Sequence, residues 1–324
     1  MKDGQRFIDG LQRALRAEFE HDPLVMILGE DVAVGGPFGV TSGLVDEFGE
    51  GRVMNTPISE ESIMGVAIGA AAAGRRPIIE IMFIDFLTLA MNQLVNHAAK
   101  LRYMSGGQLS IPMVIRVQQG AEGGWGSQHS QSLESWFLHV PGLKVYTASN
   151  SIDAESMMRA AIQDDDPVMF LEHRGLYFSN DNLILNKIED PEKARIVRDG
   201  CDLTVVSYSR MTRECLNAAA QLAEEGIEAE IIDLRSLQPL DLDTIIESIK
   251  KTFRVMIVHE AVMVGGVGAE IAAQIQNLAF DWLDAPVTRV GAPFAPVPAS
   301  PILEKAYIPN SALILEAARS LVGD

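Results

Sequence analysis

The chain has 324 residues, of which 48% are hydrophobic and 22% are charged, so it can bury the cores of two ordinary domains and is not disordered. Its formal net charge of −18 argues against nucleic acid or an anionic membrane as a partner. Its two cysteines, Cys201 and Cys215, form no C-x-x-C motif and support neither a disulfide framework nor a thiolate metal site. With a charged N-terminus and no long apolar run, we expect a cytoplasmic protein.

In the first half of the chain, short β-type runs alternate with helical patterns, beginning with an amphipathic helix near Arg6–Glu20. The predicted strands are Leu24–Leu28, Ile78–Met82, Met113–Val117, Leu143–Thr147 and Val168–Glu172. The predicted helices between them are Ser62–Ala73, Phe86–Tyr103, Gln131–His139 and Ile152–Gln163. This alternation is typical of a parallel sheet covered by helices on both faces.

The pattern lapses at Tyr177–Gly200, a polar segment with Pro191 and charges of both signs, as is typical of a linker. A second α/β set then follows. Its predicted strands are Leu203–Tyr208, Ala229–Leu234, Val255–Val258 and Val287–Val290, and its predicted helices are Thr212–Glu225, Leu242–Lys250, Ala269–Phe280 and Ala312–Leu321. We therefore predict two three-layer α/β domains, over residues 1–188 and 189–324.

Glu60 stands at the start of a helix that is made almost wholly of small residues. Glycine and alanine dominate the stretch from Gly65 to Gly74, so this helix can approach a sheet or a second subunit closely. The carboxylate would then lie on a buried seam, where acid–base groups are often found. The alternative is an ordinary helix cap, because the helix dipole favours an acid in the first turn.

Three further features are candidates for chemistry. His129 lies among polar residues on a Gly-rich loop that precedes a helix, a setting in which functional groups concentrate. The run from Asp164 to Asp166 is either a solvated turn or part of an oxygen-ligand cation site. Phe83 and Phe86 follow a strand, where a ring either fills the core or stacks on a heterocycle at the sheet edge.

The glycine-rich segment Gly265–Ile271 follows a strand and opens a helix, as a dinucleotide-binding loop does. It lacks the third glycine of that fingerprint, and the acidic residue expected downstream falls beyond the helix. A loop that lets its helix pack on another subunit is the alternative. The sequence contains no nucleophile elbow, zinc helix or phosphate loop.

As a set, six motifs in order along the chain resemble one family, the beta subunits of the thiamine-diphosphate-dependent, decarboxylating component of 2-oxoacid dehydrogenase complexes. Pyruvate, branched-chain 2-oxoacid and acetoin dehydrogenases belong to it. The motifs are GEDVA (Gly29–Ala33), TPISE (Thr56–Glu60), RYMSGGQ (Arg102–Gln108), QHSQSLE (Gln128–Glu134), HVPGLKV (His139–Val145) and IDLRSLQPLD (Ile232–Asp241). The resemblance implies a transketolase-like pair of α/β domains, a pyrimidine-binding domain and a transketolase C-terminal domain.

The resemblance also implies roles for individual residues. Glu60 corresponds to the acid that hydrogen-bonds N1′ of the coenzyme's aminopyrimidine and thereby promotes the nucleophilic form of the thiazolium ring. Phe86 corresponds to the ring that stacks on the pyrimidine, with Ile58 and Met82 near it. His129 corresponds to the active-site histidine that faces the substrate and the incoming lipoyl group.

A potassium site, present in some family members, carries over as Met113, Ala161, Ile162 and Asp164, mainly through their carbonyls, and Asp166. The family's Gly-Asp-Gly motif for Mg²⁺ and the diphosphate is missing from this sequence. We therefore expect an alpha subunit to supply that half of the site in an α2β2 heterotetramer, which would serve a lipoyl-bearing acyltransferase core. Asn92 departs from the aspartate that is common in the family.

The segments IDFLTLAMNQ (Ile84–Gln93) and HSQSLESWF (His129–Phe137) resemble pyruvate- or acetoin-type enzymes more than branched-chain 2-oxoacid dehydrogenases. Two hypotheses from other classes stay open. One is a nicotinamide-dependent oxidoreductase built on Gly265–Gly268, and the other is a non-catalytic scaffold subunit that keeps the fold.

Overall fold

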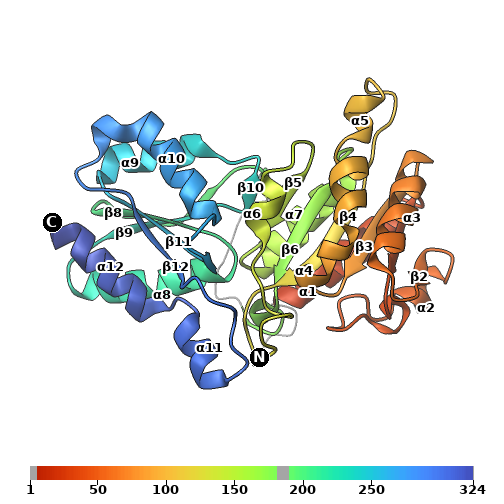
Figure 1. The fold of residues 1–324 in the computed structure, drawn as a ribbon, viewed down its shortest axis with the longest axis horizontal. Coiled ribbons are helices and arrows are strands. Elements are labelled where there is room, and N and C mark those ends of the chain that lie inside the picture. The colour runs from red at the N-terminus through yellow and green to blue at the C-terminus, as the bar shows by residue number, and fades with distance from the viewer. Residues whose placement is uncertain (1–5, 181–189, 324) are drawn as a thin grey trace. The chain divides into compact units, whose positions relative to one another are not determined.

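The computed structural model describes residues 6–180 and 190–323 (Figure 1). The chain divides into two compact units. The first contains the described residues up to Gln119 together with Trp136–Pro191, and the second contains Gly120–Ser135 and the described residues from Glu192 onward. The predicted boundary between residues 188 and 189 falls outside the described residues.

The first unit is an α/β structure with a parallel sheet in the order β5-β6-β4-β3-β1-β2. Its strands are β1 (Val25–Gly29), β2 (Val53–Asn55), β3 (Arg76–Ile81), β4 (Val114–Gln119), β5 (Lys144–Thr147) and β6 (Val168–His173). Its α-helices are α1 (Phe7–His21), α2 (Leu44–Phe48), α3 (Glu60–Ala72), α4 (Ile84–Leu87), α5 (Leu101–Met104), α6 (Glu134–Leu138, which begins in the loop of the second unit) and α7 (Ser151–Gln163).

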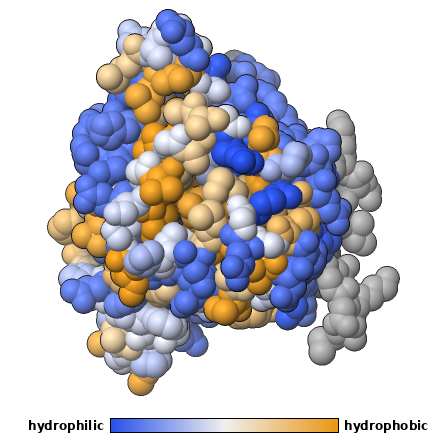
Figure 2. All heavy atoms as spheres, turned by 90° about the vertical axis from the view of Figure 1, so that its right-hand side faces the viewer, coloured by the Kyte–Doolittle hydropathy of each residue, from blue (hydrophilic) through white to orange (hydrophobic). Residues whose placement is uncertain are grey.

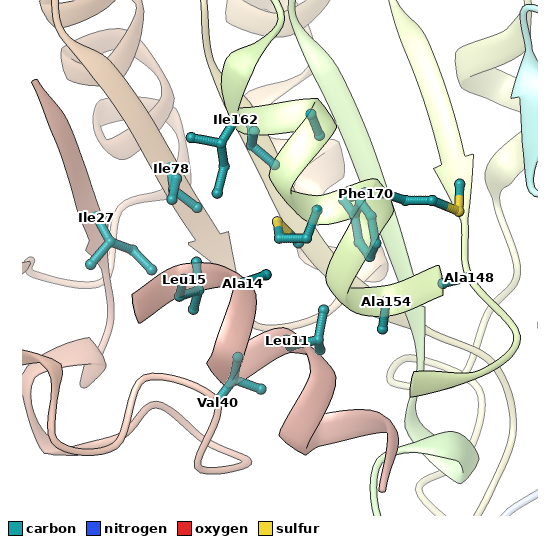
Figure 3. Packing of buried hydrophobic residues seen from close by; sticks show 14 of the residues in the cluster. Leu11, Ala14, Leu15, Ile27, Val40, Ile78, Ala148, Ala154, Ile162 and Phe170 are labelled. Atoms are coloured by element: carbon teal, nitrogen blue, oxygen red, sulfur yellow. The ribbon is translucent and has the colours of Figure 1, made fainter. Parts of the chain in front are cut away.

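Helices α1 and α7 pack against each other on one face of this sheet. Leu11 and Leu15 of α1 and Ala154 of α7 contact a core that includes Ile78 of β3 and Phe170 of β6 (Figure 3). Helix α3 packs on β3, with Ile63, Met64, Ala67, Ile68 and Ala71 buried. Because β4 and β6 are buried along their whole length, their apolar residues run almost without alternation, as in a sheet covered on both faces.

The second unit has a sheet in the order β12-β11-β8-β9-β7, parallel except for the antiparallel pair β7–β9. The strands of this half of the chain are β7 (Arg195–Arg198), β8 (Leu203–Ser207), β9 (Ala229–Asp233), β10 (Ser236–Gln238), β11 (Val255–Val262) and β12 (Thr288–Ala292). Its α-helices are α8 (Arg210–Glu224), α9 (Leu242–Thr252), α10 (Val267–Ala279), α11 (Pro301–Tyr307) and α12 (Ser311–Gly323).

Three of the predicted segments differ in the structure, and α2, β10 and α11 were not predicted. The expected helix Phe86–Tyr103 is broken into α4, a 3-10 turn, the π-helix Gln93–Ala98 and α5, since helical periodicity does not reveal a change of hydrogen-bond spacing. The expected helix Gln131–His139 shrinks to α6, because the Gln131 carbonyl accepts from Gly120 N–H (3.2 Å). The predicted linker contains β7, a partly exposed edge strand that is polar for that reason.

The exposed face of α3 carries the small residues that the sequence analysis singled out. Gly65, Val66 and Gly69 are exposed, and a Cβ atom added at Gly69 would meet nothing within 4 Å. Figure 2 shows apolar patches between hydrophilic residues on one face of the molecule. No helix within residues 6–180 and 190–323 combines the length and the apolar character that crossing a bilayer requires.

Candidate functional site

The residues proposed to contact a heterocycle follow two strands of the first unit, β2 and β3. Strand β1 lies between β2 and β3, and all three are parallel. Ile58 and Glu60 follow β2, whereas Met82 and Phe86 follow β3. The carboxyl ends of parallel strands share one edge of a sheet, so the topology brings these four residues to the edge at which ligands bind in α/β proteins.

Glu60 is the first residue of α3, and it is buried, with 7% of its surface exposed. Among the described residues, its carboxylate has no hydrogen-bond or ion-pair partner. In the described part of the chain its oxygens are not among the fully buried polar atoms that lack a partner, so a ligand at this edge can reach the carboxylate. The helix N-terminus provides partial positive charge, and Ser59 makes no side-chain cap.

Glu30, directly after β1, is a neighbour of Glu60 that the sequence analysis missed. Burial raises the pKa of Glu30, and the negative charges of Glu60 and Asp31 raise it further. The sequence signal for Glu30 was an acidic residue directly after a predicted strand, in the motif GEDVA. The two carboxyl groups give this edge a strongly acidic character.

An aromatic cluster borders the same edge. Phe86 on α4 is half-buried and meets the buried Phe83 edge-on, with ring centroids 5.4 Å apart. The guanidinium of Arg174 lies 5.2 Å from the centre of the Phe83 ring, and Phe38 meets that ring from another side. Phe83 is therefore a core residue, whereas Phe86, together with the 80% exposed side chain of Ile58, remains accessible to a flat ligand.

A buried ionic network lies near this edge in the same unit. Arg116 on β4, 2% exposed, donates to both oxygens of Glu172 (2.7 and 2.8 Å) and also to Glu80. The Tyr177 hydroxyl donates to Glu172 (2.6 Å). Burial is the largest influence on Glu80 and raises its pKa, although the guanidinium of Arg116 opposes that shift.

The glycine-rich segment Gly35–Val40 lies against this network. Gly36 has φ +68°, and a Cβ atom there would collide with a carboxylate oxygen of Glu80. Phe38 stacks on Tyr177 with ring centroids 5.3 Å apart. Gly36 is thus explained by close packing over a buried carboxylate, whereas Gly35 packs against Ser42.

His129 belongs to the second unit, on the loop Gly120–Ser135. It is half-buried, and its ring centroid lies 6.5 Å from that of Trp125. His129 N–H donates to the Gly126 carbonyl (3.3 Å), which closes a turn at the loop tip. The structure thus groups Glu60, Ile58, Met82 and Phe86 in one unit and places His129 in the other.

The residues predicted to bind potassium gather where α7 ends and β6 begins, but most of their oxygens are already engaged. Arg76 donates to the carbonyls of Ile162 (3.1 Å) and Asp164 (2.9 Å). The Met113 carbonyl accepts from Val168 N–H (3.0 Å). Ala161 is buried in the last turns of α7.

The acidic turn is also balanced by cations from the protein itself. Lys144 pairs with Asp164 (2.5 Å), Arg76 with Asp165 (2.8 Å) and Arg102 with Asp166 (2.6 Å). Three carboxylates therefore face three cationic side chains. In this arrangement the residues do not fit a potassium ion, because a guanidinium occupies two of the carbonyl ligands. Within the described part of the chain, no cluster of three or more His, Cys, Asp or Glu residues could hold a metal.

Two glycines of Gly265–Ile271, Gly266 and Gly268, lie against His259, a fully buried residue of β11. A Cβ atom at Gly266 or Gly268 would approach the imidazole to 2.8 Å, and one at Gly291 would approach it to 3.0 Å. Nδ1 lies 3.0 Å from the Ala261 carbonyl oxygen, and burial lowers the pKa of His259 to about 4. Space for a neutral imidazole accounts for this motif without a nucleotide.

Asn92, the departure from the family pattern, is exposed and accepts a hydrogen bond from Asn96 (2.9 Å) at the start of the π-helix. Its amide replaces a charge at a position open to solvent. An asparagine in place of the family's aspartate at this position therefore leaves the internal packing of the first unit unaffected.

Comparison with known proteins identifies both halves of the chain. Residues 4–179 match the family model of the transketolase pyrimidine-binding domain, and residues 192–314 match that of the transketolase C-terminal domain. A solved structure described as a split-gene transketolase, an inactive beta4 tetramer, has a TM-score of 0.82 at 22% identity and covers 99% of each chain. The predicted transketolase-like α/β fold is confirmed.

Two relatives align over nearly the whole chain. The pyruvate dehydrogenase E1 component subunit beta of Gracilaria tenuistipitata var. liui is 45% identical over 316 residues, which is 97% of this chain and 98% of the relative. The acetoin:2,6-dichlorophenolindophenol oxidoreductase subunit beta of Cupriavidus necator is 45% identical over 321 residues, 95% of each. Both are beta subunits, in agreement with the resemblance seen in the motifs.

Proposed function

Because this chain belongs to the family of thiamine-diphosphate-dependent 2-oxoacid dehydrogenase beta subunits, we propose that it works with an alpha subunit in pyruvate or acetoin oxidation. The reaction is oxidative decarboxylation of a 2-oxoacid, or cleavage of acetoin, with transfer of the acyl group to a lipoyl domain. The observation that carries this proposal is the buried, unpartnered carboxylate of Glu60 at the ligand-binding edge of the first sheet. A scaffold subunit without chemistry would have no need to bury it.

Thiamine diphosphate, when bound, supplies the nucleophilic carbon that adds to the substrate carbonyl. The residues present fit its pyrimidine half. Glu60 offers an acceptor that can share a proton with the ring nitrogen N1′. Phe86 offers an accessible ring for stacking, and Ile58 and Met82 provide apolar contact. We assign His129 to the substrate and lipoyl side of the reaction, where an imidazole can donate and accept hydrogen bonds.

The diphosphate half of the coenzyme needs Mg²⁺ and backbone donors, and neither a Gly-Asp-Gly motif nor a carboxylate cluster for a metal is found in the described chain. We propose that an alpha subunit provides both in an α2β2 assembly, and that a lipoyl-bearing acyltransferase receives the product. The exposed, small-residue face of α3 is the surface we assign to contact with another subunit.

We predict that this chain alone binds thiamine diphosphate and Mg²⁺ weakly and is inactive, whereas the chain co-purified with its alpha partner binds the coenzyme and turns over substrate. Calorimetric titration measures binding, and a substrate panel of pyruvate, acetoin and branched-chain 2-oxoacids measures activity. If the complex turns over only branched-chain 2-oxoacids, these acids and not pyruvate or acetoin are its substrates. Coenzyme binding without turnover of any of them would favour a scaffold, and decarboxylation by the isolated chain would contradict the need for a partner.

We further propose that the Asp164–Asp166 turn needs no potassium, because Arg76, Lys144 and Arg102 already balance it. Exchange of KCl for choline chloride at equal ionic strength should leave the thermal midpoint of the assembled complex unchanged, while Arg76→Met should lower it. Differential scanning calorimetry measures both. A midpoint that rises specifically with K⁺ in the unmodified complex would refute this proposal.

A further inference from the structure

The loop that carries His129 is held by two buried carboxylates of the second unit. Ala121 N–H donates to Glu260 (2.6 Å), and Gly124 N–H donates to both oxygens of Glu304 (3.1 and 3.0 Å). Glu260 is 7% exposed and Glu304 is 6% exposed. Hydrogen bonds from backbone amides to a carboxylate are stronger than those between neutral groups, so these two contacts help to fix the start of the loop, together with Arg210, which donates to the Ala121 carbonyl (3.1 Å).

Glu304 occupies an unexpected position on its helix. It is the buried residue of α11, while its neighbours Ile302 and Leu303 are 82% and 59% exposed. A helix that packed for stability alone would turn its isoleucine and leucine inward and its glutamate outward. Helix α11 thus buries its glutamate against Gly124, while Ile302 and Leu303 face away from the described part of the chain.

Close packing reinforces the same attachment. Gly124 has φ +74°, and a Cβ atom there would lie 2.8 Å from the Ala299 carbonyl oxygen. Gly126 has φ +75°, with its added Cβ atom 3.3 Å from that of Ala299. Ser127 Oγ donates to the Val297 carbonyl (2.9 Å). The loop thus contacts the segment Val297–Glu304 at three residues, through hydrogen bonds of Gly124 and Ser127 and close packing of Gly126.

His129 follows these attachment points within five residues. Its N–H bonds the Gly126 carbonyl, and Gly120 N–H bonds the Gln131 carbonyl to close the base of the loop. We propose that Glu304 is a positioning residue for His129, fixing through Gly124 the turn that presents the imidazole. This inference rests on the role proposed above for His129 in the reaction.

A double-mutant cycle in the αβ complex tests whether Glu304 acts through His129. Glu304→Ala should lower kcat at least about tenfold with little change in KM, since an anchoring contact and not a substrate contact is lost. Glu304→Gln, which keeps one acceptor oxygen, should restore part of that loss. In a His129→Ala background, Glu304→Ala should have no further effect on kcat. The exposed Glu316 of α12 gives a matched control, and Glu316→Gln should behave as wild type.

A spectroscopic measurement makes the test independent of catalysis. Trp125 lies on the loop and is 52% exposed. In a chain with Trp136→Phe and Trp282→Phe, Trp125 is the single tryptophan, and Glu304→Gln should increase its quenching by acrylamide. If Glu304→Ala does not fold, Glu304→Gln decides the result. Unchanged quenching and unchanged kcat, or losses that are additive with His129→Ala, would overturn the inference. A complex inactive on every substrate would instead contradict the proposed function, while the quenching still reports on the loop.

Discussion

Glu60→Gln should lower kcat of the assembled complex by about 10²–10⁴-fold, the usual contribution of a positioned acid–base group. Glutamine keeps the size of the side chain but cannot take up or release a proton at the ring nitrogen. Because the carboxylate has no partner among the described residues, its loss leaves no protein group unsatisfied. The effect should therefore fall on turnover and not on folding.

The measurement is steady-state turnover of the co-purified pair, with assembly checked by size-exclusion chromatography. Glu61→Gln is the matched control, since Glu61 is the next residue of the same helix, is exposed and accepts a hydrogen bond from Gln93 (2.7 Å) that glutamine can still accept. Near-normal turnover by an assembled Glu60→Gln complex would remove Glu60 from the mechanism.

Arg116→Met should destabilise the chain by about 3–5 kcal/mol, the cost of leaving buried charges uncompensated. The Arg116 guanidinium forms ion pairs with both Glu172 and Glu80. Methionine fills much of the volume of the arginine side chain but neutralises neither carboxylate. Urea unfolding followed by circular dichroism measures the free energy of unfolding. The control Arg13→Met breaks a half-exposed pair with Glu155 and should cost less than about 1 kcal/mol. Equal losses in the two variants would show that the buried network does not stabilise the fold.

Glu80→Gln tests the same network by pH. Burial raises the pKa of Glu80 in the folded state, so its contribution to stability is fully present below its unfolded pKa and is lost as pH rises through the folded pKa. Glutamine does not titrate. The free energy of unfolding of the variant should therefore increase relative to that of wild type as the pH rises above the ordinary pKa of a glutamate. This trend would show that burial outweighs the opposing guanidinium of Arg116 at Glu80.

The sequence contained enough information for the fold class and for half of the candidate site. Strand–helix alternation is local, and Glu60 was recognisable because an acid before a small-residue helix is unusual. The grouping of Glu60 with Phe86 depends on the order β3-β1-β2, which no single segment encodes. The resemblance to a family supplied that grouping before the topology did.

Other features could not be read from local patterns. Arg116, Glu80 and Glu172 each interrupt an apolar strand, but their pairing depends on strand register. The glycines near Gly266 were considered as a nucleotide loop, although they pack around His259, which is close in space through β11. Glu304 is 180 residues from Gly124, so only the folded chain brings its carboxylate to the His129 loop.

The measurement that tests the central claim most directly is hydrogen–deuterium exchange at the thiazolium C2 position of coenzyme bound to the assembled complex. With Glu60 in place, exchange should be fast, and in the Glu60→Gln complex it should slow by at least about 10²-fold while the coenzyme stays bound. Equal exchange rates in the two complexes, with equal occupancy, would contradict the account.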